Sequence, residues 1–220
     1  MPYEIKTINA GGVNCYLVAG SDGRFVLIDS GISFGRGRLV KTLENAGVQP
    51  GSLRLIVITH ADPDHTGSAA FLRRKYGAKI TMHAAEIRAA ESGNSLYNRK
   101  PQAFLTRLIF SLTAVGPANR FRPDFTVVDG QDLSEYGLDA QVVHLPGHTF
   151  GELGVLTTQG DLFCGDMLMH EKTGLRLGYG NPADFHASLE KLKALPVKTF
   201  YPGHGQPFSV EVFRKFLVDF

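Results

Sequence analysis

Four short stretches of the chain combine histidine and aspartate with glycine or proline, and these acidic and imidazole side chains are common ligands of transition metals. The first, ITHADPDHTG at 58–67, holds two histidines and two aspartates within six positions; the others are PGHTFGE, FCGDML and YPGHGQP. Imidazole nitrogen and carboxylate oxygen together suit zinc, iron and manganese. The candidate ligands are His60, Asp62, Asp64, His65, His148, Asp166 and His204.

The spacing of these stretches shows that a folded sheet must bring them together. His148 lies 83 residues after His65, Asp166 follows after 18 residues and His204 after a further 38. A single PGH or GD is usually only a turn, but glycine beside a candidate lets the backbone turn sharply where a strand ends. The four stretches in this order therefore predict one metal centre.

The residues between these stretches have the pattern of a layered α/β fold. Apolar runs bounded by turn residues indicate strands, and apolar positions spaced by three and four indicate helices. In the first half, strands are expected at 13–19, 25–30, 53–60 and 79–83, and helices at 37–47 and 67–78. In the second half, strands are expected at 124–130, 140–147, 151–160, 161–166 and 197–205, and helices at 184–195 and 209–220. Two halves of similar content predict two facing mixed sheets with helices outside, in one domain over 1–220.

Residues 92–124 interrupt the alternation of strand and helix. They contain AFLTRLIFSL, which predicts a helix at 103–112, and the basic residues Arg99, Lys100, Arg107, Arg120 and Arg122. Long insertions in compact domains often form lids or binding loops, so a helical lid is expected here. The alternative is a pair of surface helices packed on the core.

Length and charge narrow the class of protein. The 220 residues suffice for one domain with a sizeable core, and a net charge of +2 does not favour nucleic acid or an anionic membrane as partner. No apolar run is long enough for a membrane-spanning helix, and the first residues lack the pattern of a signal peptide, so a cytoplasmic protein is expected. Cys15 and Cys164 have no CxxC spacing and are expected to be buried thiols. The expected partner is a small-molecule substrate, and the oligomeric state stays open.

The order of the four stretches resembles that of the metallo-β-lactamase fold superfamily of hydrolases. The pattern of that family is HxHxDH, then PGHT, then an aspartate in a GD turn, then a histidine in PGHG. The similarity covers almost the whole chain, including VNCYLV and FVLIDSG near its start. It implies a four-layer αβ/βα sandwich with the site at the edge between the two sheets.

The resemblance also implies how the candidates divide between two divalent ions. One ion takes His60, position 62 and His148; the other takes Asp64, His65 and His204; Asp166 bridges them. Asp29, in LIDSG, resembles an aspartate behind the ligands that orients one of them, although an aspartate there could also cap a turn. Zinc is the first expectation for both ions, with iron or manganese as alternatives.

The chain departs from the family pattern at Asp62, which replaces the usual histidine and gives HxDxDH. Asp62 could bind the metal, since its carboxylate oxygen reaches about as far from Cβ as the nearer ring nitrogen of histidine. It could also miss the metal and leave one tightly bound ion, or the centre could be inactive. Retention of every other ligand favours the first alternative; metal analysis that found a single zinc would exclude it.

Aspartate at this position also changes the charge of the predicted centre. Two divalent ions, three carboxylates and a bridging hydroxide sum to zero charge, against +1 with a histidine at position 62. The sequence therefore predicts a weaker Lewis acid than in a centre with histidine. The oxygen ligand should also shift the preference toward iron or manganese relative to zinc.

The chemistry expected of such a centre is hydrolysis. A metal-bound hydroxide attacks an ester-like carbonyl while a metal ion polarises the carbonyl oxygen, with Asp64 and Asp166 as the catalytic carboxylates. Only 16 residues follow His204, too few for the C-terminal helical domain of glyoxalase II, and no nuclease motif is found. The expected substrate is a small-molecule ester, lactone or thioester.

Two other functions stay open from the sequence. A glutamate at position 62 occurs in the flavin-linked diiron oxygen reductases of the superfamily, so an iron-dependent oxygenase or reductase is the main alternative. Metal identity and oxygen consumption would distinguish it from a hydrolase. A non-enzymatic binding module with a degraded centre is the other alternative, and absence of bound metal would favour it.

Several further residues are lesser candidates for roles in the site. Tyr97 and Tyr179 could donate a proton, and Arg36 or Arg38 could contact an anion. His170 follows Asp166 closely enough to line a pocket. The remaining histidines are expected to be structural or surface residues; they are His83, His144 and His186.

Overall fold

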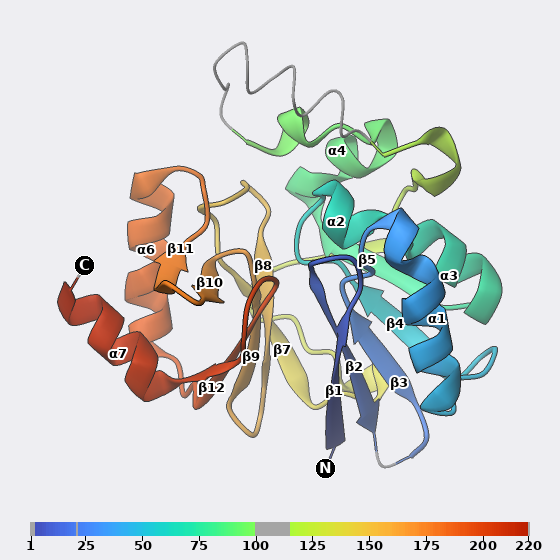
Figure 1. Ribbon diagram of the computed structural model, residues 1–220, viewed down its shortest axis with the longest axis horizontal. Helices are drawn as coiled ribbons and strands as arrows, with labels where there is room; N and C mark the ends of the chain where they lie inside the picture. The colour runs from blue at the N-terminus through green and yellow to red at the C-terminus, as the bar shows by residue number, and fades with distance from the viewer. Residues whose placement is uncertain (1–2, 21, 100–114, 220) are drawn as a thin grey trace.

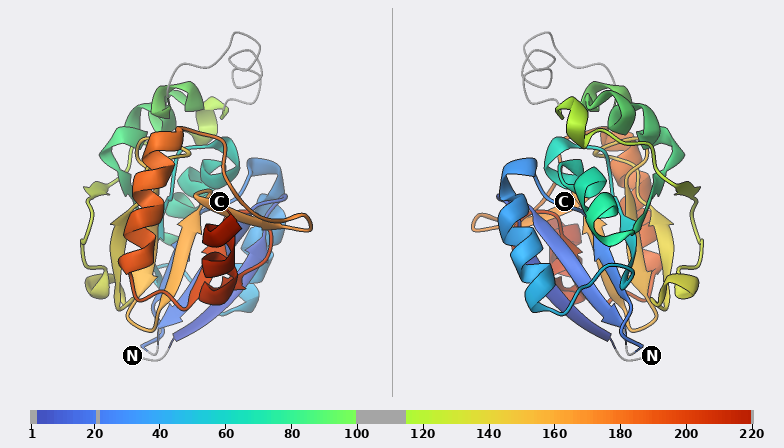
Figure 2. Two further views of the ribbon diagram at one scale, coloured as in Figure 1. Left: turned by 90° about the vertical axis from the view of Figure 1, so that its left-hand side faces the viewer. Right: turned by 90° about the vertical axis from the view of Figure 1, so that its right-hand side faces the viewer.

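Two β-sheets pack face to face at the centre of the molecule, and helices cover the outer face of each (Figure 1). The computed structural model describes residues 3–20, 22–99 and 115–219. Helices α1 (Arg36–Asn45) and α3 (Ala69–Tyr76) lie on one side, and α6 (Pro182–Ala194) and α7 (Val210–Asp219) lie on the other (Figure 2). The four-layer αβ/βα sandwich predicted from the sequence is confirmed.

The first sheet is built from the first half of the chain and is mixed. Its strands follow the order β1-β2-β3-β4-β5-β6, with antiparallel pairs up to β3 and parallel pairs from β3 onward. Their bounds are Tyr3–Asn9, Asn14–Gly20, Phe25–Ile28, Leu53–Val57, Lys79–His83 and Phe125–Val127. The parallel strands end at one edge of the sheet, and the first stretch of candidate ligands follows β4 there.

The second sheet contains five strands in the order β13-β12-β9-β8-β7, of which only β12 and β9 pair in parallel. These strands, taken from β7 to β13 along the chain, span Ala140–His144, Leu153–Thr157, Asp161–Gly165, Thr199–Pro202 and Phe208–Ser209. A separate two-stranded hairpin follows β9 and consists of β10 (Leu168–Glu171) and β11 (Gly174–Leu177).

Strand β2 shows how alternate side chains hold the layers together. Cys15 and Leu17 pack under α1 and α3, whereas Tyr16 and Val18 pack between the two sheets. Because both faces of the strand are buried, its sequence is a continuous apolar run. Between the sheets, the ring of Tyr16 lies 5.2 Å from that of Phe163 in β9, centroid to centroid.

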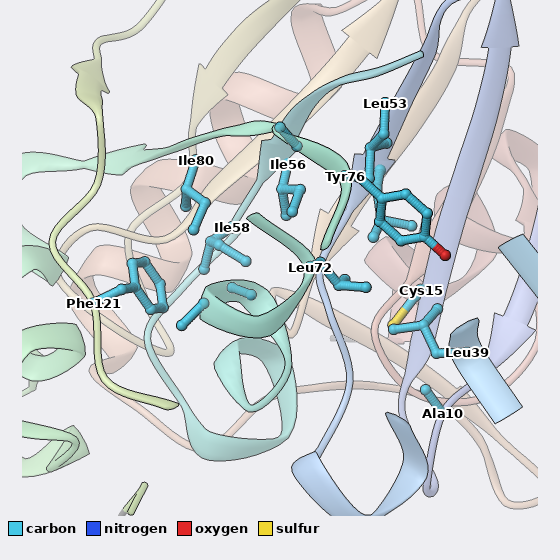
Figure 3. Packing of buried hydrophobic residues seen from close by; sticks show 14 of the residues in the cluster. Ala10, Cys15, Leu39, Leu53, Ile56, Ile58, Leu72, Tyr76, Ile80 and Phe121 are labelled. Atoms are coloured by element: carbon cyan, nitrogen blue, oxygen red, sulfur yellow. The ribbon is translucent and has the colours of Figure 1, made fainter. Parts of the chain in front are cut away.

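The outer cores fill the space between each sheet and its helices. Under α1 and α3, Leu39 and Leu72 of the helices belong to the same buried cluster as Ile56 and Ile80 of the sheet (Figure 3). A comparable cluster around Phe200 lies between the second sheet and α6 and α7. Both cysteines are free and buried, as predicted. In the described part of the chain, no helix is long and apolar enough to cross a membrane.

Several elements differ from the predicted ones, first of all beside the candidate ligands. The strand predicted at 53–60 ends at Val57, and the residues after it lead to the first candidate ligands. The helix predicted at 67–78 is preceded by a short helix α2 (Pro63–Thr66) and itself begins at Ala69. Helix α4 (Ile87–Ser92) and a 3-10 turn at Ser95–Asn98 follow β5. The helix predicted at 103–112, with the lid role assigned to it, lies outside the described residues.

Candidate metal centre

The four sequence stretches meet at one end of the sandwich, where strands of both sheets end. His60 follows β4, Asp166 follows β9 directly, and His204 follows β12. His148 lies four residues beyond the end of β7. These four candidate ligands therefore stand on loops that are anchored by buried strands, which fixes their positions without placing them in a sheet.

The first stretch presents four polar side chains from a single tight turn. Asp62 has extended backbone and precedes Pro63, the first residue of α2, a position that suits the fixed φ of proline. The hydroxyl of Thr66 donates to the backbone oxygen of Asp62 at 2.9 Å and closes this turn. Asp62 lies with one group of candidate ligands, whereas Asp64 and His65 lie together in another.

The side chains form two groups, and Asp166 lies between them. In the first, Oδ2 of Asp62 lies 3.2 Å from Nε2 of His148 and 3.7 Å from Nε2 of His60. All three are buried, and their ligand atoms lie within 4.8 Å of one another.

The second group consists of Asp64, His65 and His204, and Asp166 stands between the two groups. Oδ2 of Asp64 lies 3.3 Å from Nε2 of His204. Oδ1 of Asp166 lies 3.4 Å from Nε2 of His65, and its Oδ2 lies 3.4 Å from Nε2 of His204 and 4.0 Å from Nε2 of His148. The structure thus brings all seven candidate ligands together, and their division between two ions stays a prediction.

Three buried ligand atoms show that these residues suit metal ions. Among the described residues, Nε2 of His60, Nε2 of His65 and Oδ1 of Asp166 have no hydrogen-bond partner. A buried polar atom without a partner destabilises a fold by about 1–3 kcal/mol. Coordination of a cation would satisfy all three atoms at once, so the donor set fits divalent metal ions.

The other ring nitrogen of three of these histidines is held by a neighbour, which directs Nε2 to the centre. Nδ1 of His65 lies 2.8 Å from Oδ2 of Asp29. Nδ1 of His148 lies 2.7 Å from the backbone oxygen of Tyr179, and Nδ1 of His204 lies 3.0 Å from that of Gly12. An acceptor at Nδ1 keeps the proton there and leaves the lone pair of Nε2 free for a metal.

Asp29 occupies an unusual backbone position behind the first stretch. Its φ of 59° is the only positive value among the described residues other than glycine. Its carboxylate accepts the backbone N–H of Thr59 at 2.8 Å and the Thr59 hydroxyl at 2.9 Å. Asp29 therefore fixes both the loop after β4 and the ring of His65.

The loop that carries His204 is tied to the first sheet. The side-chain amide of Asn14 donates to the backbone oxygens of Pro202 and Gly205, at 3.1 and 2.8 Å. The hydroxyl of Tyr16 donates to the same oxygen of Pro202 at 2.6 Å. Residues from β2 thus hold the loop of the last candidate ligand in place.

The pKa of each ionisable side chain in the metal-free centre depends on the charges of the others. Burial lowers the pKa of His60 well below its usual value, and the nearby His65 adds to this effect. Burial would also lower the pKa of His148, but its hydrogen bond with Asp62 and the surrounding carboxylates raise it to about 9. Burial would raise the pKa of Asp166, yet His65 and the other imidazoles hold it well below its usual value. The imidazoles and carboxylates of the centre therefore shift one another's pKa.

Three residues near the centre were not predicted as part of it. Arg99 donates from Nη2 to Oδ1 of Asp62, and its side chain is only 7% exposed. Glu152 accepts the backbone N–H of Asp166 at 2.6 Å, and burial raises its pKa to about 8. Glu86 accepts the backbone N–H groups of Ala61 and Gly151, at 2.8 and 2.9 Å. Glu152 ends the PGHTFGE stretch, whereas nothing in the sequence around Glu86 or Arg99 marks them as neighbours of a metal ligand.

The lesser candidates mostly lie away from the centre. The side chain of Tyr179 is exposed and that of Tyr97 lies under Arg88, whose guanidinium carbon is 4.0 Å from the ring centroid. Arg36 donates to the backbone oxygen of Gly67 at 2.9 Å and therefore packs the loop next to α2. His170 is half-buried in β10, and the imidazoles of His83 and His144 stack on each other with centroids 4.4 Å apart.

A cavity of about 150 Å³ opens beside the first group of ligands. It is lined by both polar and apolar side chains, which include Arg99, His148, Phe150, Asn181 and Pro182. Its position next to His148 makes it the part of the surface that a substrate at the centre would contact.

Comparisons with known proteins relate the chain to metal-dependent hydrolases of one superfamily. The model of the metallo-beta-lactamase superfamily matches residues 8–204. A hydroxyacylglutathione hydrolase from Albidiferax ferrireducens is 31% identical over 167 residues, which cover 73% of this chain and 51% of that protein. The chain spans about half the length or less of the first such relatives.

Solved structures share the fold along nearly the whole chain. The metallo-beta-lactamase family protein TTHA1429 from Thermus thermophilus has a TM-score of 0.74 at 24% identity and covers 98% of this chain and 77% of its own. TTHA1623, crystallised in a di-iron-bound form, has a TM-score of 0.72 at 26% identity and covers 96% of this chain and 97% of its own.

Proposed function

The chain belongs to the metallo-beta-lactamase superfamily, and from that premise we propose that it is a metal-dependent hydrolase of a thioester or related ester bond in a small molecule. The observation that carries the proposal is the convergence of seven ligand side chains, three of which have a buried atom without a partner among the described residues. The relatives named hydroxyacylglutathione hydrolase support a thioester as the bond cleaved. Because the chain matches only about half of their length, the thiol part of the substrate is left unspecified.

The ligands divide into two sets in this proposal. His60, Asp62 and His148 would hold one divalent ion, Asp64, His65 and His204 a second, and Asp166 would contact both. When bound, the ions would supply an acidified water as nucleophile and polarise the carbonyl oxygen of the substrate. Zinc is the first expectation, and iron is the alternative that the di-iron-bound neighbour supports.

The residues of the chain act by orienting donors and moving a proton. Asp29 and the backbone oxygens of Tyr179 and Gly12 keep Nε2 of three histidines directed at the centre. Asp64 is one-third exposed, whereas Asp62 and Asp166 are buried, so Asp64 is the carboxylate best placed to orient the attacking water and accept its proton. The acyl part of the substrate would lie in the cavity beside His148, where Phe150 and Pro182 offer apolar contact.

The proposal is tested by measuring metal content and hydrolysis on the same protein. Protein reconstituted with zinc, iron or manganese is assayed against acyl thioesters of glutathione and of a simple thiol, aryl esters and lactones. We expect two ions per chain and fastest cleavage of thioesters. Asp166→Asn should lower both metal content and activity, while Asp132→Asn, at an exposed aspartate outside the centre, should change neither. A protein that holds two ions and cleaves none of these substrates faster than the metal-free form contradicts the proposal.

An iron-dependent redox enzyme is the second candidate, because one structural neighbour was crystallised in a di-iron-bound form. The carboxylate of Asp62 in the first ligand group is a harder donor than imidazole and suits iron. Oxygen consumption by the iron-loaded protein with a thiol or other electron donor, together with no thioester cleavage, would favour this candidate over the hydrolase.

A further inference from the structure

The two carboxylate oxygens of Asp62 have different partners. Oδ1 accepts a hydrogen bond from Nη2 of Arg99, whereas Oδ2 faces Nε2 of His148 at 3.2 Å and Nε2 of His60 at 3.7 Å. We propose that Arg99 is a positioning residue for the first metal ion and that the Arg99–Asp62 pair replaces the histidine usual at position 62. The inference rests on the metal centre proposed above but does not depend on which bond the enzyme cleaves.

Arg99 limits how the carboxylate can bind a metal. A free carboxylate can offer both oxygens to one ion, but a guanidinium on Oδ1 leaves only Oδ2 facing the two histidines. Asp62 then presents one donor atom, as an imidazole does. Both side chains are almost fully buried, at 7% exposed for Arg99 and 11% for Asp62, so solvent does not compete for Oδ1.

The charge of the pair also equals that of a neutral histidine. With Asp62 alone, two divalent ions, three carboxylates and one bridging hydroxide sum to zero. The permanent charge of Arg99 restores the total of +1 that a centre with histidine would have. The weaker Lewis acidity expected from the ligand count alone is therefore offset by Arg99, while the preference of an oxygen donor for iron or manganese is not.

Arg99 is itself fixed by a closed set of hydrogen bonds. Its Nε donates to Oδ1 of Asn98 at 3.1 Å, and the amide of Asn98 donates to Oε2 of Glu86 at 2.6 Å. The same oxygen of Glu86 accepts the backbone N–H of Ala61 at 2.8 Å, next to Asp62 in the chain. Hydrogen bonds thus connect the loop of Asp62 to Glu86, Glu86 to Asn98, and Asn98 to Arg99, which in turn binds Asp62. Such a connected set fixes the guanidinium of Arg99, as a positioning role requires.

The decisive experiment compares Asp62→His with the double variant Asp62→His/Arg99→Met. Each protein is loaded with zinc and challenged with increasing chelator, and the metal left per chain is measured. In Asp62→His the buried Arg99 loses its counter-ion beside the metal, so one ion should bind about tenfold or more weakly than in the wild type. In the double variant its affinity should return to within about threefold of the wild type.

The recovery in the double variant separates a charge partner from structural damage, since removal of a second side chain does not repair a damaged fold. If Asp62→His holds both ions as tightly as the double variant, the proposal is wrong. Lack of hydrolysis by wild-type protein that holds two ions would refute the proposed function but leave this inference standing.

A second measurement needs only a single variant at Arg99. In Arg99→Met loaded with cobalt, both oxygens of Asp62 are free to bind, so the coordination number rises and the visible absorption weakens. Arg88→Met is the matched control, because Arg88 lies over the ring of Tyr97, is exposed and is not among the ligands. A cobalt spectrum of Arg99→Met that equals those of the wild type and the control would overturn the positioning role.

Discussion

Asp29→Asn should weaken metal binding, although Asp29 is not itself a ligand. The carboxylate of Asp29 lies 2.8 Å from Nδ1 of His65 and accepts the backbone N–H of Thr59 at 2.8 Å. Because a carboxylate only accepts, His65 carries its proton on Nδ1 and leaves Nε2 free. Asparagine has nearly the same shape and tolerates the φ of 59° at this position, so the backbone should be preserved.

The size of the effect follows from these contacts. With its oxygen held by Thr59, the asparagine would turn its amide N–H toward Nδ1 of His65, which then has to accept. The proton of His65 moves to Nε2, the atom that lies 3.4 Å from Asp166 in the centre. Loss of such a partner typically lowers metal affinity about 10- to 100-fold. That range equals about 1.4–2.8 kcal/mol of binding free energy.

The assay is competition with a chelator, followed by the number of metal ions retained per chain. Asp124→Asn is the matched control, since Asp124 accepts the backbone N–H of Ile80 at 2.7 Å in the same sheet but lies outside the metal centre. Retention of two ions by Asp29→Asn at the chelator concentration that the control withstands would refute the reasoning about the His65 proton.

Three further predictions concern protons and space in the centre. The pKa of His148 is about 9 in the metal-free protein, so its proton stabilises the metal-free fold below about pH 6.5, and this contribution is lost as pH rises through 9. Zinc binding at pH 7 should therefore release protons, and zinc affinity should increase toward pH 9. A calorimetric binding enthalpy that is the same in buffers of different ionisation enthalpy would contradict this proton release. Gly203→Ala should reduce metal content, because its Cβ would overlap Oδ1 of Asp166 and lie 2.7 Å from Cε1 of His65, whereas Gly37→Ala in α1, with nothing within 4 Å, should leave metal content unchanged. Glu152→Gln should change the unfolding free energy of the metal-free protein by less than about 1 kcal/mol at pH 7, since burial raises the pKa of Glu152 to about 8 and the amide oxygen still accepts from Asp166. Glu152→Ala should lower the unfolding free energy by about 1–3 kcal/mol, measured by urea denaturation. Equal losses in both variants would contradict a protonated Glu152.

The convergence of the seven candidate side chains could be predicted from the sequence because its signals are local. Each histidine or aspartate stands beside a turn residue at the end of an apolar run, and the layered fold brings such ends together. The departure at Asp62 was also visible in the sequence. Whether Asp62 coordinates a metal stays a prediction, although its Oδ2 faces His60 and His148 in the structure.

The partner of Asp62 could not be predicted in the same way. Arg99 lies 37 residues further along the chain, in a loop that has no periodic pattern, and was only one of several basic residues in its segment. Its contact depends on Glu86 and Asn98, whose hydrogen bonds are set by tertiary packing. An ion pair between residues so far apart in the chain leaves no recognisable pattern in the sequence around either residue.

The strands β1, β10 and β11 were not predicted, for a simpler reason. β1 is an edge strand in which only Ile8 is buried, so its sequence YEIKTIN lacks a strong apolar run. The hairpin of β10 and β11 is four residues long on each side, and β11 has no fully buried residue. Strands held mainly by backbone pairing are hard to recognise from side-chain pattern.

The hydrogen bonds from Asn14 and Tyr16 to Pro202 have a consequence for the order of folding. They join positions 188 and 186 residues apart in the chain, and His204 lies just beyond them. Contacts between such distant positions form late, because a long loop must close before they contribute. During synthesis the first sheet would emerge with His60 and His65 in place but without its last ligand. Tight metal binding would therefore mark the moment at which the second half of the chain has docked onto the first.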